Sequence, residues 1–411
     1  MEKANCIVCQ SGGPTSVINA SLYGVIKEAK KHNQINNIYG ALNGIVGVIE
    51  DKLIDLRKLD EENLDLLKQT PSAILGSVRH CLNTKFDEEY KKILNVLQKH
   101  NIRYFYYIGG NDSMDTVAKL SAYLNEVQYS CFVIGIPKTI DNDLEITDHT
   151  PGYGSAIKYI ASAINEIKED TKCYINGRVT IVEIMGRDAG WLTAATKLAC
   201  LNQNAPDLIY LPEVAFDTEK FLQDVERIYQ KQQKVLVCVS EGIKDKTGEY
   251  VQNQMRRYAV QKDKFSHIQL GGIAAYLTSL VKHKLNLPVR GIELNLLQRC
   301  ASHIASESDI YEAIHCGEYA VIESLKQITG KVVIMRRENL KNYNLHYEMC
   351  DVNQIANKVK FFPKEWIVNE NDIHFDFISY ALPLMDKQYH CIWKNGMVAY
   401  TKLNQKELSV D

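Results

Sequence analysis

Three charged residues in one short loop are the first candidates for chemistry. Lys138, Asp141 and Asp143 follow the apolar run 131–136, whose composition predicts a buried strand. A carboxylate at a strand end can accept the proton of a substrate hydroxyl as a general base, and a lysine is a compact positive charge suited to phosphate. A solvated charged loop has the same composition, so the catalytic interpretation depends on the neighbouring motifs.

Two glycine pairs predict places where the backbone approaches a ligand. Gly12–Gly13 and Gly109–Gly110 each follow an apolar run and precede a predicted helix. Free N–H groups and the helix dipole at such a helix N-terminus favour phosphate, and glycine lets the ligand come close. Neither turn has the spacing of a Walker loop or of a dinucleotide-binding fingerprint. A tight connection without a ligand explains either pair equally well.

Single arginines stand in several other loops. Arg79 follows a Gly-Ser-Val run, and Arg187 lies within the loop 185–190 after another predicted strand. Arg290 and Arg299 flank a further apolar run. Separate cations without a basic face suit a small ligand with several phosphates better than a nucleic acid. Together with the carboxylates, they predict phosphoryl transfer to a sugar phosphate, driven by positioning and electrostatics.

The elements that would position these residues follow a strand–turn–helix order. Apolar runs end in glycine-containing or polar loops and lead into amphipathic helices, which is the pattern of βαβ units with parallel strands. In such sheets ligands bind outside the carboxyl ends of the strands, where the charged loops fall. We therefore predict an α/β fold with mainly parallel sheets in two doubly wound, Rossmann-like lobes. The predicted strands are 4–10, 103–108, 131–136, 179–185 and 234–239.

The composition excludes several classes of protein. The 411 residues are 45% hydrophobic and 24% charged, which is typical of soluble globular domains. The 48 Lys and Arg residues nearly balance the 50 Asp and Glu residues, for a net charge of −2, so there is no electrostatic footprint for nucleic acid or a membrane surface. The longest weakly charged stretch, 265–281, is shorter than the roughly 20 apolar residues of a spanning helix.

Cysteine usage and the N-terminus predict a cytoplasmic protein. The 11 cysteines are an odd number spread along the chain, as is typical of reduced thiols. Cys6 and Cys9 have the spacing of a redox or zinc half-site, but residues three apart on a strand face opposite sides. No second cysteine pair supplies further ligands. The first residues carry no cleavage-site pattern of a secretory signal.

The order and spacing of five motifs resemble those of the 6-phosphofructokinases. The resemblance covers residues 4–340 and rests on Gly12–Gly13, Gly76–Arg79, Gly109–Ser113, Pro137–Asp143 and Met185–Arg187. It implies the phosphofructokinase fold, with a phosphoryl-donor lobe at 1–148 and a fructose-6-phosphate lobe at 149–296. A segment at 297–341 returns to pack on the first lobe, and a C-terminal extension follows at 342–411. Short runs at 389–393 and 397–400 predict a hairpin in this extension, which we interpret as a cap without catalytic residues.

By this resemblance Asp141 corresponds to the base that deprotonates the 1-hydroxyl of fructose 6-phosphate, while Thr139 and Arg187 steady the transferring phosphoryl group. Arg178 and Arg290 correspond to arginines that family members offer to a neighbouring subunit, which implies a homo-oligomer with shared sites. The implied catalytic residues are Asp141, Lys138, Asp112, Asp143 and Arg187. The implied substrate-binding residues are Gly13, Arg79, Thr139, Ile140, Asp141, Arg178, Met185, Gly186, Arg187, Glu241, Arg290 and Arg299.

Two positions indicate which phosphoryl donor the resemblance implies. ATP-using members have glycine where Asp112 and Lys138 stand, and pyrophosphate-using members have Asp and Lys. A carboxylate at 112 would fill and charge the space that the α-phosphate of ATP needs, whereas Lys138 can contact pyrophosphate directly. Ile45 and Thr116 replace a Tyr and a Gly found around adenine in bacterial ATP enzymes. The chain therefore resembles the pyrophosphate-dependent branch, with Mg2+ as cofactor. An ATP-dependent enzyme and a non-catalytic regulatory subunit are the alternatives.

Three departures from the family pattern bear on the site. Asn111 replaces an aspartate that helps to hold magnesium, so it is the predicted metal ligand, or ligation moves to Asp112 or to water. Leu296 replaces a His or Tyr that touches the sugar phosphate. An insertion precedes Arg290, and its run 265–272 resembles the family's His-Ile-Gln-Arg-Gly-Gly motif. The segment 289–299 matches better because it restores both arginines at the right spacing.

Overall fold

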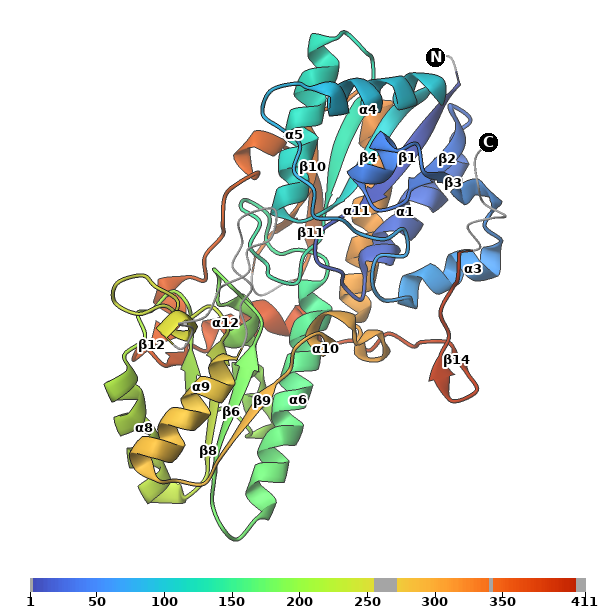
Figure 1. The fold of residues 1–411 in the computed structure, drawn as a ribbon. Coiled ribbons are helices and arrows are strands. Elements are labelled where there is room, and N and C mark those ends of the chain that lie inside the picture. The colour runs from blue at the N-terminus through green and yellow to red at the C-terminus, as the bar shows by residue number, and fades with distance from the viewer. Residues whose placement is uncertain (1–2, 255–271, 340–342, 404–411) are drawn as a thin grey trace.

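The computed structural model describes residues 3–254, 272–339 and 343–403, and its two α/β lobes lie one above the other in Figure 1. The first lobe is built on a seven-stranded sheet with the order β11-β10-β5-β4-β1-β2-β3, and the second on a four-stranded sheet with the order β7-β8-β6-β9. Most of the run 265–272, which resembles a family motif, lies outside the described residues.

Both sheets are mainly parallel. In the first sheet β1, β2, β4, β5 and β10 pair in parallel, while β3 and β11 are antiparallel edge strands. All three pairs of the second sheet are parallel. The predicted α/β fold with mainly parallel sheets is confirmed. The strands of the first sheet are β1 (Ala4–Gln10), β2 (Ile35–Ala41), β3 (Leu53–Asp55), β4 (Ile102–Gly109), β5 (Phe132–Pro137), β10 (Lys331–Arg337) and β11 (Leu345–Asp351), and those of the second are β6 (Val179–Ile184), β7 (Leu208–Tyr210), β8 (Val235–Ser240) and β9 (Val289–Glu293).

Alternate residues of the buried strands face two layers of helices in the first lobe. Ile7 and Cys9 of β1 pack in a cluster with residues of α4 (Glu88–Lys99) and α5 (Asn111–Glu126). Cys6 and Val8 pack in a second cluster with α1 (Ile18–Lys31) and α11 (Glu307–Leu325). Cys6 and Cys9 therefore face opposite sides of the sheet, as the two-residue period of a strand requires, and both are free thiols.

Two glycines let α1 and α11 pack backbone against backbone. A Cβ atom at Gly24 would lie 2.1 Å from the carbonyl oxygen of Ile314, and one at Gly317 would lie 2.3 Å from that of Ser21. A side chain at either position would force the helices apart. This contact fixes α11, a late segment of the chain, against the helix that follows the Gly12–Gly13 turn.

The second lobe carries its helices around the four-stranded sheet. Its helices are α6 (Tyr153–Cys173), α7 (Trp191–Ala194), α8 (Thr218–Gln232) and α9 (Ile273–Leu280), and α10 (Leu297–Cys300) leads back toward the first lobe. The first lobe also holds the short helices α2 (Ile45–Ile49) and α3 (Glu61–Leu66). In the described parts of the chain, no helix combines the length and the apolar character needed to cross a membrane.

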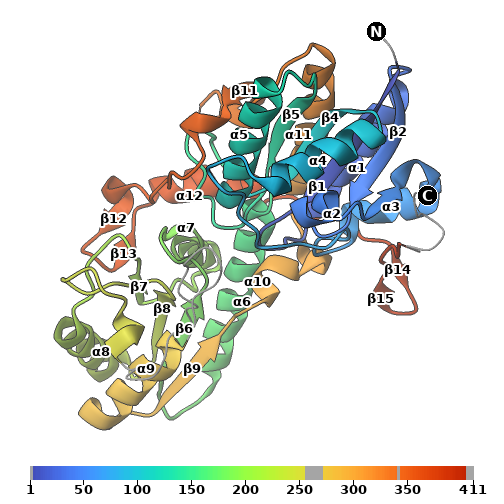
Figure 2. The same cartoon turned by 45° about the horizontal axis from the view of Figure 1, so that its top comes forward.

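The C-terminal extension touches both lobes (Figure 2). After β11 it packs Phe362 and Phe377, the latter in α12 (Asp376–Ala381), against Trp191 and its neighbours in the second lobe. It contains the strand pairs β12 (Ile367–Val368) with β13 (Asp372–Ile373) and β14 (Trp393–Lys394) with β15 (Met397–Val398), so the predicted hairpin is present in shortened form. The Gln69 side chain of the first lobe donates hydrogen bonds to the carbonyl oxygens of Ile392 and Ala399, at 2.9 and 2.6 Å.

Candidate active site

Loops from both lobes meet around one cavity of about 360 Å3. The first lobe contributes residues that follow the carboxyl ends of β1, β4 and β5, and the second contributes residues that follow β6 and β8. This is the edge at which parallel sheets bind ligands. The lining residues are Ser11, Gly12, Gly13, Val78, Arg79, His80, Gly110, Asn111, Asp112, Ser113, Lys138, Thr139, Asp141, Asp143, Met185, Arg187, Asp188, Ala189, Glu241, Arg299, Asn357 and Val359.

The cavity contains all five predicted catalytic residues, Asp112, Lys138, Asp141, Asp143 and Arg187. It also contains Asn111 and these predicted substrate-binding residues: Gly13, Arg79, Thr139, Met185, Glu241 and Arg299. Four predicted residues, Ile140, Gly186, Arg178 and Arg290, do not line it. Leu296 is also outside the lining, with 54% of its surface exposed.

Lys138 joins two loops of the first lobe. Its side chain is buried, and its Nζ donates a hydrogen bond of 2.6 Å to the carbonyl oxygen of Gly13. A Cβ at Gly12 would lie 3.2 Å from this Nζ, and Gly12 has a φ of +77°, so glycine meets both the space and the conformation there. Burial lowers the pKa of Lys138 to about 8, although Asp141 and Asp143 oppose the shift. The ammonium is thus held at the cavity wall with little water to share its charge.

Asp141 and Asp143 are two half-buried carboxylates in one loop. The Thr139 hydroxyl donates to Asp141 Oδ2 at 3.2 Å and accepts from the Asp141 backbone N–H at 3.1 Å, which orients this carboxylate. Burial raises the pKa of Asp141, opposed by the Thr139 hydrogen bond and by Arg187. Burial, together with the charge of Asp141, raises the pKa of Asp143 to about 7. A carboxylate whose pKa moves toward neutrality is a more effective general base than an ordinary surface aspartate.

Glu241 and Gln298 organise the second-lobe side of the cavity. Glu241 Oε1 accepts a hydrogen bond of 3.2 Å from the Gly186 backbone N–H, and Gln298 Oε1 accepts one of 3.1 Å from that of Met185. Gly186 therefore shapes the wall through its backbone without lining it. Arg187 Nε is buried without a hydrogen-bond partner among the residues that the structure describes, so this side of the guanidinium suits an anionic ligand.

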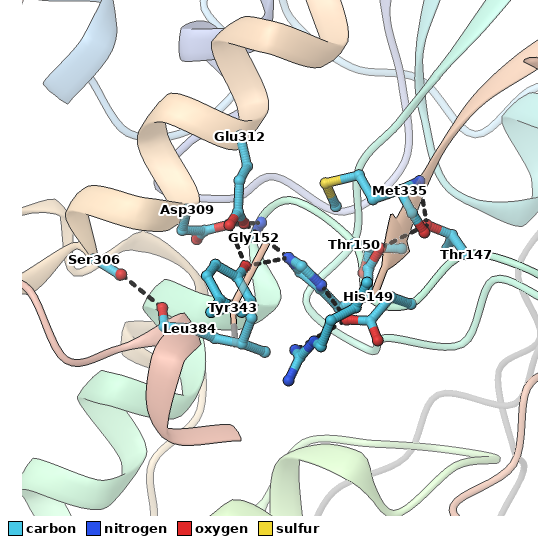
Figure 3. Close-up of polar contacts among 12 residues, drawn as sticks. Thr147, His149, Thr150, Gly152, Ser306, Asp309, Glu312, Met335, Tyr343 and Leu384 are labelled. Atoms are coloured by element: carbon cyan, nitrogen blue, oxygen red, sulfur yellow. Dashed lines mark hydrogen bonds and ion pairs between the residues drawn. The ribbon is translucent and has the colours of Figure 1, made fainter. Parts of the chain in front are cut away.

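A buried ionic network supports the loop that follows Asp143 (Figure 3). His149 lies between Asp148 and Glu312 of α11, with both nitrogen–oxygen distances at 2.7 Å. Burial opposes the charged form of His149, but the two carboxylates raise its pKa to about 9, so the imidazolium persists at neutral pH. Asp148 also accepts a hydrogen bond of 2.9 Å from Arg337 of β10. The network ties the loop that follows β5 to α11 and β10 of the first lobe.

Arg178 and Arg290 lie at the other end of the second sheet. Arg178 immediately precedes β6, where its guanidinium carbon lies 5.2 Å from the ring centre of Tyr174. Arg290 lies next to Thr180 of β6 and forms an exposed ion pair of 3.4 Å with Asp170. Neither arginine reaches the cavity of its own chain. Ile140 instead points into the hydrophobic core of the second lobe.

Sequence reasoning missed several cavity residues. His80 and Asp188 directly follow the predicted Arg79 and Arg187, so sequence proximity was a usable signal. His80 pairs with Glu89 at 3.0 Å, and Asp188 accepts hydrogen bonds from Lys244 and Tyr250 at 3.2 and 3.1 Å. Asn357 and Val359 carry no such signal, because they belong to the extension, for which the sequence predicts a cap without catalytic residues.

Comparison with known proteins identifies the family. Residues 5–289 match the family described as phosphofructokinase. The chain belongs to the phosphofructokinase family. It is 38% identical over 393 residues to the pyrophosphate–fructose 6-phosphate 1-phosphotransferase of Rhodospirillum rubrum, covering 94% of this chain and 95% of that protein. It is 34% identical over 410 residues to the protein of the same name from Halomonas elongata, covering 98% and 97%.

A solved structure of this phosphofructokinase family agrees over the whole length. The pyrophosphate-dependent phosphofructokinase from Marinobacter aquaeolei superposes with a TM-score of 0.88 at 33% identity, covering 99% of this chain and 98% of that one. The agreement therefore includes the C-terminal extension, which lies beyond the residues matched by the family. The resemblance to the phosphofructokinases, and to their pyrophosphate-dependent branch, is confirmed.

Proposed function

We propose that this chain transfers a phosphoryl group reversibly from inorganic pyrophosphate to the 1-hydroxyl of fructose 6-phosphate, as a step of glycolysis and gluconeogenesis. The observation that carries the choice of donor is the pair Lys138 and Asp112, which line the same cavity as the catalytic carboxylates. A buried ammonium offers direct charge to pyrophosphate, and the carboxylate occupies space that a nucleotide α-phosphate would need. The relatives and the solved structure described above bear names of this activity.

The two walls of the cavity bind different substrates. Lys138, Arg79 and the Gly12–Gly13 turn belong to the first lobe and hold pyrophosphate, while Glu241 and Arg299 hold the sugar phosphate. Phosphoryl transfer has little covalent chemistry for the protein to perform, so positioning and charge stabilisation account for most of the catalysis.

The reaction at the centre is a displacement at phosphorus. Asp141 accepts the proton of the 1-hydroxyl as that oxygen bonds to one phosphorus of pyrophosphate, and the bridging P–O bond breaks with its electron pair staying on the departing phosphate. Arg187 and Lys138 stabilise the negative charge carried by the transferring group. The reverse reaction returns the proton from Asp141 to the sugar oxygen.

Magnesium fits the side chains of this cavity. Asp112, Asp141 and Asp143 offer carboxylate oxygens there, the donor type that magnesium prefers. Among the described residues no three His, Cys, Asp or Glu side chains are grouped as a metal cage. One or two carboxylates would therefore hold the ion together with substrate phosphates, as is usual for magnesium. When bound, it would neutralise charge on the pyrophosphate oxygens.

Donor-dependent turnover of the purified full-length protein tests the proposal. We expect phosphorylation of fructose 6-phosphate with pyrophosphate and magnesium, and little turnover with ATP. Faster turnover with ATP would establish the ATP-dependent alternative. Absence of turnover with either donor, restored by a second type of subunit, would establish a non-catalytic sugar-phosphate-binding subunit instead.

The pH dependence of kcat/KM for pyrophosphate should be bell-shaped. On the acid side the loss of activity should begin at a higher pH than for an ordinary aspartate, because burial raises the pKa of Asp141 and the base must be deprotonated. On the alkaline side activity should fall as Lys138 loses its proton through about pH 8. Lys138→Arg should abolish the alkaline fall, because arginine keeps its charge. A wild-type profile without a decline above pH 8 would refute the role assigned to Lys138.

We also propose that the active sites of a homo-oligomer share Arg178 and Arg290 between subunits, and that the protein is cytoplasmic. Both arginines lie outside the cavity of their own chain, and the guanidinium of Arg290 forms an exposed ion pair with Asp170. All 11 cysteines are free thiols, which agrees with a reducing compartment.

Mixed oligomers test the sharing of sites. Arg290→Ala should raise the KM for fructose 6-phosphate about ten-fold, through loss of a charge-assisted contact. Mixing this variant with Asp141→Asn should restore activity, because a site then combines an intact Asp141 with the partner's Arg290. Arg227→Ala, which removes another exposed arginine of the second lobe, is the matched control and should leave the KM for fructose 6-phosphate unchanged. Failure of the mixture to gain activity over both parents would show that the sites are not shared.

A further inference from the structure

The amide of Asn111 is bonded to the C-terminal extension. Its Oδ1 accepts a hydrogen bond of 2.5 Å from the backbone N–H of Asn357, and its Nδ2 donates to the carbonyl oxygen of Lys358. The Asn357 side chain in turn donates to Asp115 Oδ1 at 2.9 Å. Residues 355–362, here called the arm, are therefore anchored to the first turn of α5.

The arm also contacts the loop 138–148, which contains Asp141 and Asp143. The backbone N–H of Lys360 donates to the carbonyl oxygen of Asp143 at 2.8 Å. Its Nζ donates to Asn142 Oδ1 at 3.2 Å and to the carbonyl oxygens of Thr147 and Asp148 at 3.1 and 3.0 Å. Lys360 thus contacts the loop at two places, directly after Asp141 and again at Thr147 and Asp148.

The second lobe fixes the other side of the arm. Trp191 Nε1 donates to the carbonyl oxygen of Lys360 at 2.9 Å, and the Lys360 ammonium lies 5.1 Å from the Trp191 ring centre. Glu213 Oε1 accepts a hydrogen bond of 2.9 Å from the backbone N–H of Phe362. The arm consequently connects α5, the catalytic loop and the second lobe at the edge of the cavity, which Asn357 and Val359 line.

The contact with the arm suits an asparagine at position 111 and does not suit an aspartate. A carboxamide presents one acceptor and two donors, whereas an ionised carboxylate only accepts. The arm presents an N–H from Asn357 and a carbonyl from Lys358, so it needs a partner that both accepts and donates. An aspartate would set an oxygen against the Lys358 carbonyl, and the two acceptors would repel each other.

We infer that Asn111 is a positioning residue that docks the arm beside the pyrophosphate end of the cavity, and that it is not a magnesium ligand. The docked arm holds the Asp141–Asp143 loop through Lys360 and keeps the cavity narrow at Asn357 and Val359. This role rests on the proposed function for its kinetic consequence, but the docking itself does not depend on it.

Asn111→Asp separates the two roles, since the substitution supplies a better metal ligand and a worse docking partner. Hydrogen exchange of the ligand-free, full-length protein should become at least about ten-fold faster in the amides of residues 355–362, because their anchor is lost. The KM for pyrophosphate should rise about ten-fold, while the magnesium concentration for half-maximal activity stays unchanged. Unchanged exchange in the arm, combined with activity at lower magnesium, would overturn the inference.

Two further variants complete the test. Lys360→Met keeps the length of the side chain but removes its three hydrogen bonds, so it should loosen the same amides even if Asn111→Asp does not fold. Asp112→Asn should show the opposite pattern, with a higher magnesium requirement and unchanged exchange in the arm. If wild-type protein shows no turnover with pyrophosphate, the proposed function fails, whereas the exchange data still decide whether Asn111 docks the arm.

Discussion

Replacing Asp141 with asparagine should lower kcat at least about a hundred-fold while the KM for fructose 6-phosphate changes little, because a general base contributes to the transition state and not to ground-state binding. Asparagine has nearly the same shape and can still accept the hydrogen bond of the Thr139 hydroxyl. The loop therefore keeps its conformation, and the loss reports on proton transfer. Asp141→Ala should lose at least as much activity.

The neighbouring carboxylate is the matched control for this variant. Asp143→Asn removes a charge from the same loop, and its backbone carbonyl still accepts the hydrogen bond from Lys360. We expect a smaller effect on kcat and a clear change in magnesium dependence, because the proposed base remains. Near-normal turnover of Asp141→Asn, measured with pyrophosphate at saturating magnesium, would remove Asp141 from the role of base.

Replacing both Asp112 and Lys138 with glycine should convert the donor preference from pyrophosphate toward ATP. Loss of the buried ammonium removes a charge-assisted contact, which should lower kcat/KM for pyrophosphate by about ten- to a hundred-fold. Loss of the carboxylate clears the space and the negative charge that oppose an α-phosphate. The measurement is kcat/KM for each donor at fixed fructose 6-phosphate and magnesium.

The two single variants show whether the side chain of Asp112 or that of Lys138 excludes ATP. Lys138→Gly alone should lose pyrophosphate activity without admitting ATP, because Asp112 still repels the nucleotide. At saturating magnesium, Asp112→Gly alone should lose less pyrophosphate activity than Lys138→Gly, because the ammonium that contacts pyrophosphate remains. A thermal melt must accompany these assays, since the Lys138 side chain is buried against the carbonyl of Gly13 and its removal leaves a cavity. An unchanged ratio of the two kcat/KM values in the folded double variant would refute the argument from space and charge.

Local patterns were sufficient for the strands and for most of the site. The predicted strand 103–108 falls within β4, and the predicted strand 131–136 is displaced by one residue from β5. Charged loops at the ends of such strands converge because parallel strands present their carboxyl ends at one edge. Lys138, Asp141 and Arg187 can be assigned to that edge from the sequence alone, and all three line the cavity.

Contacts between distant segments could not be predicted in this way. Asn111 and Asn357 are 246 positions apart, and no periodicity or spacing relates them. The composition after residue 341 predicts a cap without catalytic residues, yet Asn357 and Val359 of this extension line the cavity and Lys360 contacts the loop that contains Asp141 and Asp143. These contacts form only in the packed structure, where the extension lies against both lobes.

Hydrophobic periodicity and turn residues act over a few positions, so the amino-acid order alone predicts the α/β fold class, the order of the motifs and the charged side chains that suit phosphate. The tertiary structure decided how those charges behave. Burial moves the pKa of Lys138 down to about 8 and that of Asp143 up to about 7, and burial is a property of the packed chain. The packed structure also sets which groups Asn111 contacts, because a carboxamide can bind a metal or a neighbouring backbone segment, and here its neighbours are Asn357 and Lys358.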